Sequence, residues 1–67
     1  MNTDVITQRI NQLMREYQRI YRRINTLNEL IQLSEVGDER DRRIAERKQL
    51  RVDHERVTRE LNHARRA

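Results

Sequence analysis

One pattern constrains this chain more than any other: an apolar residue recurs at alternating intervals of four and three positions through its N-terminal half. This spacing is that of a heptad repeat, and it predicts a long amphipathic helix that packs along another helix. The repeat runs without interruption through Ile6, Ile10, Leu13, Tyr17, Ile20, Ile24, Leu27 and Ile31.

Met14 and Tyr21 lie beside this repeat and widen the apolar stripe. The stripe is then broader than one neighbouring helix covers. Isoleucine at both core positions of a heptad also favours parallel coils of more than two strands. We therefore expect the repeat, together with Met14 and Tyr21, to pack within the chain and to mediate self-association.

A break between two helices is predicted at residues 34–38, which contain the only glycine of the chain. Gly37 suits the left-handed backbone conformation that ends many helices. Asp38 can then cap the following helix with its carboxylate. The alternative is a single bent or continuous helix through Gly37.

These signals predict helices over about residues 4–36 and 38–66, within one domain that spans residues 1–67. Thr3 or Asn2 can cap the first helix. Because the helices have similar lengths and are joined by a short turn, we expect an antiparallel hairpin.

The second helix carries a weaker stripe, in which Arg47 and Lys48 interrupt the apolar face. Their aliphatic stems can lie along apolar surface while the charges reach water. Folding the chain about Gly37 pairs residue i with about residue 74 − i, and the two stripes then agree in register. The expected neighbours are Ile24 and Leu50, Tyr17 and Val57, Leu13 and Leu61, Ile10 and Ala64, and Ile20 and His54.

The second helix is expected to cover only part of the first stripe. The remainder, around Met14, Tyr21 and Leu27, is then left for a second copy, and two hairpins would form a homodimeric four-helix bundle.

Composition supports this fold class. Of the 67 residues 39% are charged and only 3% are aromatic, with no proline and no cysteine. A sheet protein needs more turn, β-branched and aromatic residues, and a disulfide framework needs cysteine. No run of about twenty apolar residues exists to span a membrane. We expect a cytoplasmic, all-α protein.

The charges offer one candidate site for an anionic partner. Fifteen basic and eleven acidic residues leave a net charge of +4. Arg15, Arg19 and Arg22 fall on the side of the first helix away from the apolar stripe, and only Glu16 is close enough to offset one of them. A dimer would double this stripe, which could follow a nucleic-acid backbone. The alternative is an ordinary solvated face.

A second candidate site lies near the turn. Leu30, Leu33 and Val36 fall partly off the heptad stripe. They either wrap that end of a bundle or form an apolar patch for a protein partner.

No catalytic, cofactor or metal site is predicted. Glu60 and His63 have the spacing of carboxylate-bridged metal bundles, but Leu61 faces inward and His63 therefore faces outward. His54 falls in the stripe of the second helix, where a hydrogen-bonded core role, reaching Tyr17 or Tyr21, is favoured over metal binding. Ser34 has no histidine nearby to act as a base. Binding of the first helix to a membrane surface is also disfavoured, because tryptophan and phenylalanine are absent.

The sequence thus predicts a non-enzymatic, self-associating helical hairpin that acts as a protein-interaction or regulatory adaptor. The alternative is a binder of structured RNA through Arg15, Arg19 and Arg22. The expected arrangement resembles, in architecture only, the plasmid Rop-type RNA regulators, in which two short helices dimerise into a bundle. The resemblance includes no residue motif and carries over no functional residue.

Overall fold

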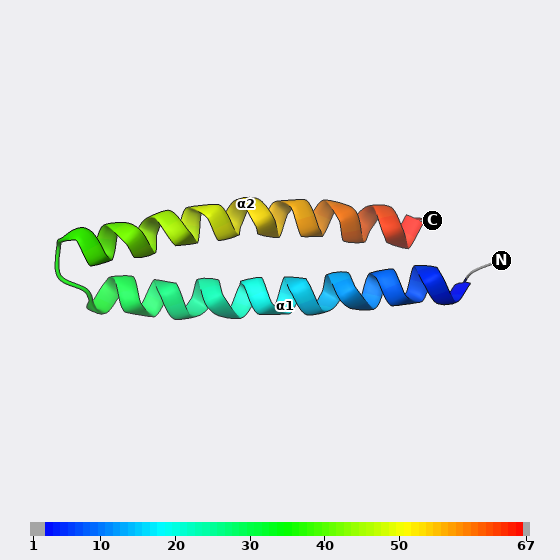
Figure 1. The fold of residues 1–67 in the computed structure, drawn as a ribbon, viewed down its shortest axis with the longest axis horizontal. Helices are drawn as coiled ribbons and strands as arrows, with labels where there is room; N and C mark the ends of the chain where they lie inside the picture. The colour runs from blue at the N-terminus through cyan, green and yellow to red at the C-terminus, as the bar shows by residue number, and fades with distance from the viewer. Residues whose placement is uncertain (1–2, 67) are drawn as a thin grey trace.

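The computed structural model describes residues 3–66, which form two α-helices and a short connection. Helix α1 spans Thr3–Leu33 and α2 spans Asp38–Arg66. The helices run antiparallel and side by side, with both chain ends at one end of the rod and the connection at the other (Figure 1). The backbone measures 54 × 14 × 13 Å along its principal axes. The predicted helical hairpin is therefore confirmed, and the continuous helix is excluded.

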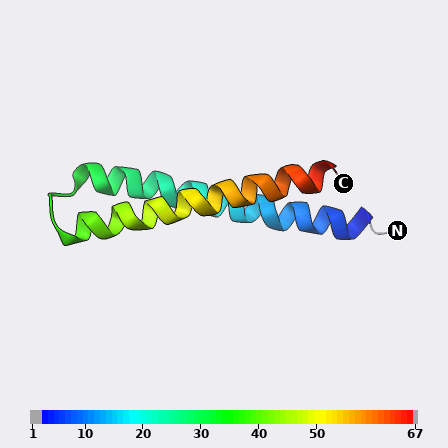
Figure 2. The same ribbon diagram turned by 90° about the horizontal axis from the view of Figure 1, so that it is seen from above.

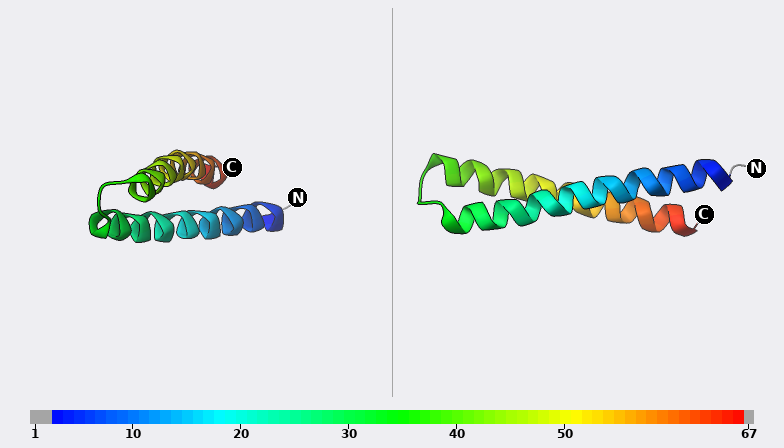
Figure 3. Two further views of the ribbon diagram at one scale, coloured as in Figure 1. Left: turned by 60° about the vertical axis from the view of Figure 1, so that its left-hand side comes forward. Right: turned by 90° about the horizontal axis from the view of Figure 1, so that it is seen from below.

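The two helices cross near their midpoints (Figure 2). The same crossing is visible from below in Figure 3. A shallow crossing of this kind keeps a heptad stripe in contact with its partner over many turns. Within residues 3–66, neither helix has an apolar stretch long enough to cross a membrane.

Helix α1 ends at Leu33, three residues before the predicted end, and the cause is Ser34. The Ser34 hydroxyl donates to the Leu30 carbonyl, and the Ser34 amide donates to the Ile31 carbonyl at 3.3 Å. The same hydroxyl accepts a hydrogen bond from Arg43 of α2. A serine that bonds locally to the backbone competes with helix continuation, and here the second helix holds it in place.

Gly37 does not adopt the predicted left-handed conformation, since no residue in the described part of the chain has a positive φ. Helix α1 has already ended four residues earlier, so no helix end at Gly37 requires that conformation. Instead, the Gly37 carbonyl accepts the Asp41 amide at 3.1 Å. Gly37 therefore occupies the cap position of α2, which the sequence assigned to Asp38, and Asp38 is the first helical residue.

At the other end of the hairpin, α1 begins at Thr3, with Asp4 in its first turn. Thr3 is thus a helical residue, and the alternative cap, Asn2, lies outside the described residues.

The core lies between the open half of α1 and the C-terminal half of α2. Its centre is formed by Leu13 and Ile20 of α1 with Val57 and Leu61 of α2, each at most 5% exposed. The residues packed around this centre are Ile10, Met14, Tyr17, Ile24, Leu50 and Ala64. The composition of this cluster agrees with the predicted register.

The turn half of the seam is different, because most of the half-buried α2 residues there are arginines, with Ile44 among them. Leu27 and Ile31 are buried, at 0% and 6% exposure, but lie outside the apolar cluster. Arg43 and Arg47 are half-buried opposite them, and Arg47 donates to the Asn28 side-chain oxygen at 2.9 Å. Arginine stems therefore cover the apolar surface that leucine and valine cover elsewhere.

Candidate interaction surface

The helix contact has two edges of different chemistry. In a heptad repeat, the positions on either side of the apolar core flank opposite edges of the contact. On one edge α1 presents Arg9, Glu16 and Arg23, spaced by seven residues, and on the other it presents Met14 and Tyr21. The first edge is held by ion pairs and the second is largely apolar.

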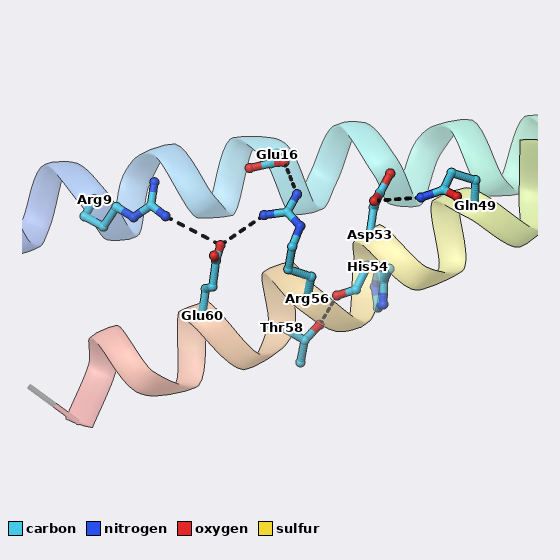
Figure 4. A network of polar contacts seen from close by, with 8 residues as sticks. All are labelled: Arg9, Glu16, Gln49, Asp53, His54, Arg56, Thr58 and Glu60. Atoms are coloured by element: carbon cyan, nitrogen blue, oxygen red, sulfur yellow. Dashed lines mark hydrogen bonds and ion pairs between the residues drawn. The ribbon is translucent and has the colours of Figure 1, made fainter.

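Four residues of the charged edge form one connected network (Figure 4). Glu60 accepts hydrogen bonds from Arg9 at 3.5 Å and from Arg56 at 3.2 Å. Arg56 also donates to Glu16 across the helix contact at 2.9 Å. The hydrogen bond to Glu16 is the main cause that raises the pKa of Arg56. The network joins the two helices at the open half of the hairpin.

A separate pair joins the helices nearer the turn. Arg23 donates to both carboxylate oxygens of Glu46, at 2.7 and 3.1 Å. These hydrogen bonds are the largest cause that lowers the pKa of Glu46 and raises that of Arg23. Such two-point contacts are directional and therefore help to set the register of the helices. We call Arg9, Glu16, Arg23, Glu46, Arg56 and Glu60 the ion-pair ladder.

Sequence reasoning did not identify this ladder, because its main contacts join residues far apart in the chain. Within a single helix the structure has two i,i+4 ion pairs among the described residues, Glu39–Arg43 at 2.6 Å and Arg56–Glu60 at 3.2 Å. The sequence signal for the ladder is the seven-residue spacing of Arg9, Glu16 and Arg23, which places charges beside the apolar core at every second turn.

The apolar edge of the contact is only partly covered by α2. Tyr21 is 52% exposed, and Tyr17 and Ile24, about one turn before and after it on the same side of α1, are half-buried. We call this surface the open face; it consists of Ile10, Met14, Tyr17, Tyr21 and Ile24.

Aromatic rings occupy the middle of the open face. The rings of Tyr17 and Tyr21 are parallel within 4° with centroids 6.4 Å apart. The Tyr17 ring also lies 4.6 Å from the His54 ring of α2, at an angle of 41°. Together with Ile24, these three rings line a shallow groove whose far side is formed by Arg51 and Glu55.

The border of the open face on α1 carries no charge. Asn11, Gln18 and Asn25 follow it at intervals of seven residues, and all three are exposed. On this border another helix can approach α1 without desolvating a charge, which is the costly step in forming many interfaces. The α2 border is charged: Arg51 and Glu55 line the groove, and Arg65 lies 3.4 Å from the Met14 sulfur.

The structure divides the residues predicted for self-association into two groups. The first is already covered by α2 and cannot meet a second copy without opening the hairpin: Leu13, Ile20, Leu27 and Ile31. Leu27 is therefore a correction, because the sequence left it for a second copy. The second group remains accessible: the open face and Ile6, which is 36% exposed.

The arginine stripe lies where the sequence placed it. Arg15, Arg19 and Arg22 are exposed, and within residues 3–66 the structure gives none of them an ion pair. Glu16, the expected neutralising residue, contacts Arg56 instead. The three guanidinium groups thus carry uncompensated positive charge.

The patch near the turn is exposed in the single chain. Leu33 and Val36 are 83% and 89% exposed, whereas Leu30 is half-buried. No ring of packed residues surrounds them, so the structure defines no binding geometry there.

Neither histidine lies in an arrangement typical of a catalytic or metal-binding site. His54 is half-buried against Tyr17, and its backbone carbonyl accepts the Thr58 hydroxyl at 2.8 Å. His63 is exposed, and Glu60 is held by two arginines. In the described part of the chain, no group of three or more metal-ligating side chains comes together.

Comparisons of the chain with protein-family models, with curated proteins and with solved structures find no match, so the open face, the ion-pair ladder and the arginine stripe are interpreted from their own geometry.

Proposed function

We propose that this chain is a non-enzymatic helical hairpin that self-associates through its open face into a homodimeric four-helix bundle. In this form it acts as a protein-interaction or regulatory adaptor in the cytoplasm. The observation that carries the proposal is the open face: an apolar and aromatic strip in the middle of α1 with a border of neutral amides.

The small size of the core supports self-association. Among residues 3–66, only six apolar side chains are buried. Chains of fewer than about 70–80 residues seldom gain enough from one apolar core and commonly add disulfides, metals or partner subunits. The chain has no cysteine. A second copy would complete the burial of Tyr17, Tyr21 and Ile24.

The test is a charge placed at the centre of the open face. We predict that Tyr21→Lys abolishes dimerisation while the hairpin keeps its helices, because the Tyr21 side chain is half-exposed in the single chain. Losing a central aromatic anchor costs about 2 kcal/mol per copy. Two copies then weaken the dimer by about a thousandfold. Light scattering over a range of concentrations measures the mass, and circular dichroism measures the helix content.

Two control variants make the result specific. Tyr21→Phe keeps the ring and should still dimerise. Gln12→Lys adds the same charge on the opposite, exposed side of α1 and should dimerise as well. A wild-type chain that is monomeric and helical at every concentration would contradict the proposal.

A second candidate function is favoured by the arginine stripe. Arg15, Arg19 and Arg22 are exposed and without ion pairs inside the described hairpin. Unpaired arginines in a row suit phosphate groups. We therefore keep binding of structured RNA as the alternative.

A further inference from the structure

The two ends of the hairpin differ strongly in charge. Residues 29–41, which surround the connection, contain five acidic residues and one arginine, a net charge of −4. Because the whole chain carries +4, all other residues together carry +8. The five carboxylate residues are all exposed: Glu29, Glu35, Asp38, Glu39 and Asp41. We call residues 29–41 the acidic tip.

The opposite end of the rod is basic. Residues 3–16 and 56–66, which lie side by side at the open end (Figure 1), carry a combined net charge of +3. The rod, 54 Å long, is therefore acidic at the tip and basic at the open end, and the residues between carry a net charge of +5. This length is several times the distance of about 8 Å over which physiological salt screens charges.

The open face is centred between these ends. Ile10, Tyr17 and Ile24 are spaced by seven residues, and so are the amides Asn11 and Asn25 on either side of Gln18. Helix α1 spans Thr3–Leu33, so its midpoint is at residue 18. The Tyr17–Tyr21 stack thus lies at the middle of the helix.

We infer that the second copy docks antiparallel to the first, through a two-fold axis that passes near Tyr17 and Gln18. In this arrangement, which rests on the proposed function, Ile10 of one copy faces Ile24 of the other. The acidic tip of each hairpin lies beside the basic open end of its partner.

Charge decides between this arrangement and the parallel one. The open faces of two copies would match in either a parallel or an antiparallel arrangement, because the same residue types recur on both sides of Tyr17. A parallel dimer, however, places two acidic tips side by side, and the net charge stays negative, at −2 over residues 29–43, even when the adjoining Arg42 and Arg43 are included. Screening prevents the distant basic residues from offsetting that repulsion. The antiparallel dimer replaces the repulsion with attraction at both ends.

Single spin labels on the full chain test the orientation, and the absence of native cysteine makes each label unique. The labelled variants are Asn11→Cys, Gln18→Cys and Asn25→Cys, which change exposed amides only. With a rise of 1.5 Å per residue, an antiparallel dimer separates the two labels at position 11 by about 21 Å along the rod. The same axial separation applies at position 25, whereas the labels at position 18 have none.

We therefore expect the shortest distance at position 18 and longer, similar distances at positions 11 and 25. Three equal distances in a chain that dimerises would show parallel docking and overturn this inference while leaving the proposed function intact. A wild-type chain that stays monomeric in light scattering would overturn both this inference and the proposed function.

Removing charge from the acidic tip provides an independent test, because it should weaken an antiparallel dimer and tighten a parallel one. Glu29→Gln with Glu35→Gln removes two exposed tip charges without touching the open face. Antiparallel docking predicts a severalfold weaker dimer at physiological salt, because attraction to the partner's basic end is lost. A tighter dimer would indicate tips that repel each other and would overturn the inference.

Discussion

At the scale of single residues, Gly37 shows that the position of a glycine relative to a helix end decides its role. It occupies the N-cap position of α2, where its carbonyl accepts the first hydrogen bond of the helix; its φ is not positive, and an added Cβ would meet no atom within 4 Å. We predict that Gly37→Ser raises stability by about 0.5–1 kcal/mol. Serine adds a cap hydroxyl and reduces the entropy of the unfolded chain. Urea unfolding at a fixed chain concentration measures the change.

Gly37→Ala is the control, since alanine reduces the same entropy but offers no cap. It should be less stable than the serine variant. If both variants lose about 1 kcal/mol or more, glycine is required for its backbone freedom, and the assignment of Gly37 as a cap is wrong.

Which residues are buried was largely predictable. Leu13, Ile20, Val57 and Leu61 follow from heptad spacing because every one lies in the seam. The burial of Leu27 was not predictable in this way. It depends on how far the stems of half-buried arginines extend over the turn half of the helix contact. Spacing identifies the position of a side chain, whereas the reach of a long, flexible neighbour depends on the folded structure.

At the scale of the helices, the ion-pair ladder links stability to pH. Arg23 lowers the pKa of Glu46. A carboxyl group with a lowered pKa in the folded state stabilises the fold above its unfolded pKa and loses that contribution as the pH falls through the folded value. We predict that Glu46→Gln reduces the loss of thermal stability on acidification below about pH 4.5, where a free glutamate side chain is half protonated.

Thermal unfolding of the wild type and Glu46→Gln at neutral and acidic pH measures this difference. Both side chains of the pair are more than 40% exposed, so salt screens the contribution and 1 M NaCl should shrink it. As a control, Glu55→Gln removes an exposed carboxylate with no ion pair in the described hairpin. Equal acid responses of the two variants would contradict a specific role for the Arg23–Glu46 pair.

The start and end of each helix were predictable to different degrees. The C-terminal helix begins where the sequence placed it, at Asp38, because acidic residues form its first turn directly after the break between the helices. The end of α1 was misplaced because Gly37 was taken as the residue that ends the helix, whereas the helix ends before Ser34, which Arg43 contacts. That contact joins residues nine positions apart across the turn, and local propensity does not include it.

At the scale of the whole molecule, dimerisation would determine how strongly the arginine stripe acts. We predict that labelled hairpin or duplex RNA, if bound, dissociates steeply with rising salt. Replacing Arg15, Arg19 and Arg22 by glutamine should then lower the slope of log K against log salt, because fewer counterions are released. Fluorescence anisotropy at low and physiological salt measures both quantities.

The control replaces three exposed basic residues of α2, Arg42, Lys48 and Arg59, by glutamine, which removes the same net charge. Equal weakening by the two triple variants would assign the binding to net charge rather than to the stripe. Absence of binding at low salt would reject the RNA alternative.

The hairpin as a whole was predictable because its two heptad stripes match in register about a single turn. The seven-residue spacing of Arg9, Glu16 and Arg23 marks a charged row beside the core, but spacing alone does not distinguish a row that α2 pairs with from one left in solvent. That distinction depends on the rotation of α2 about its axis, which brings Glu46 and Glu60 onto the side of Arg23 and Arg9.

The ion-pair ladder fastens the two helices along one edge only. On the opposite edge, Arg47 donates to Asn28 and Arg65 lies 3.4 Å from the Met14 sulfur. Between these two contacts, the groove beside Tyr17 and Tyr21 has no hydrogen bond across the described helices. Charged contacts thus fix how the helices align, while the aromatic stretch between them is left to be covered by another side chain.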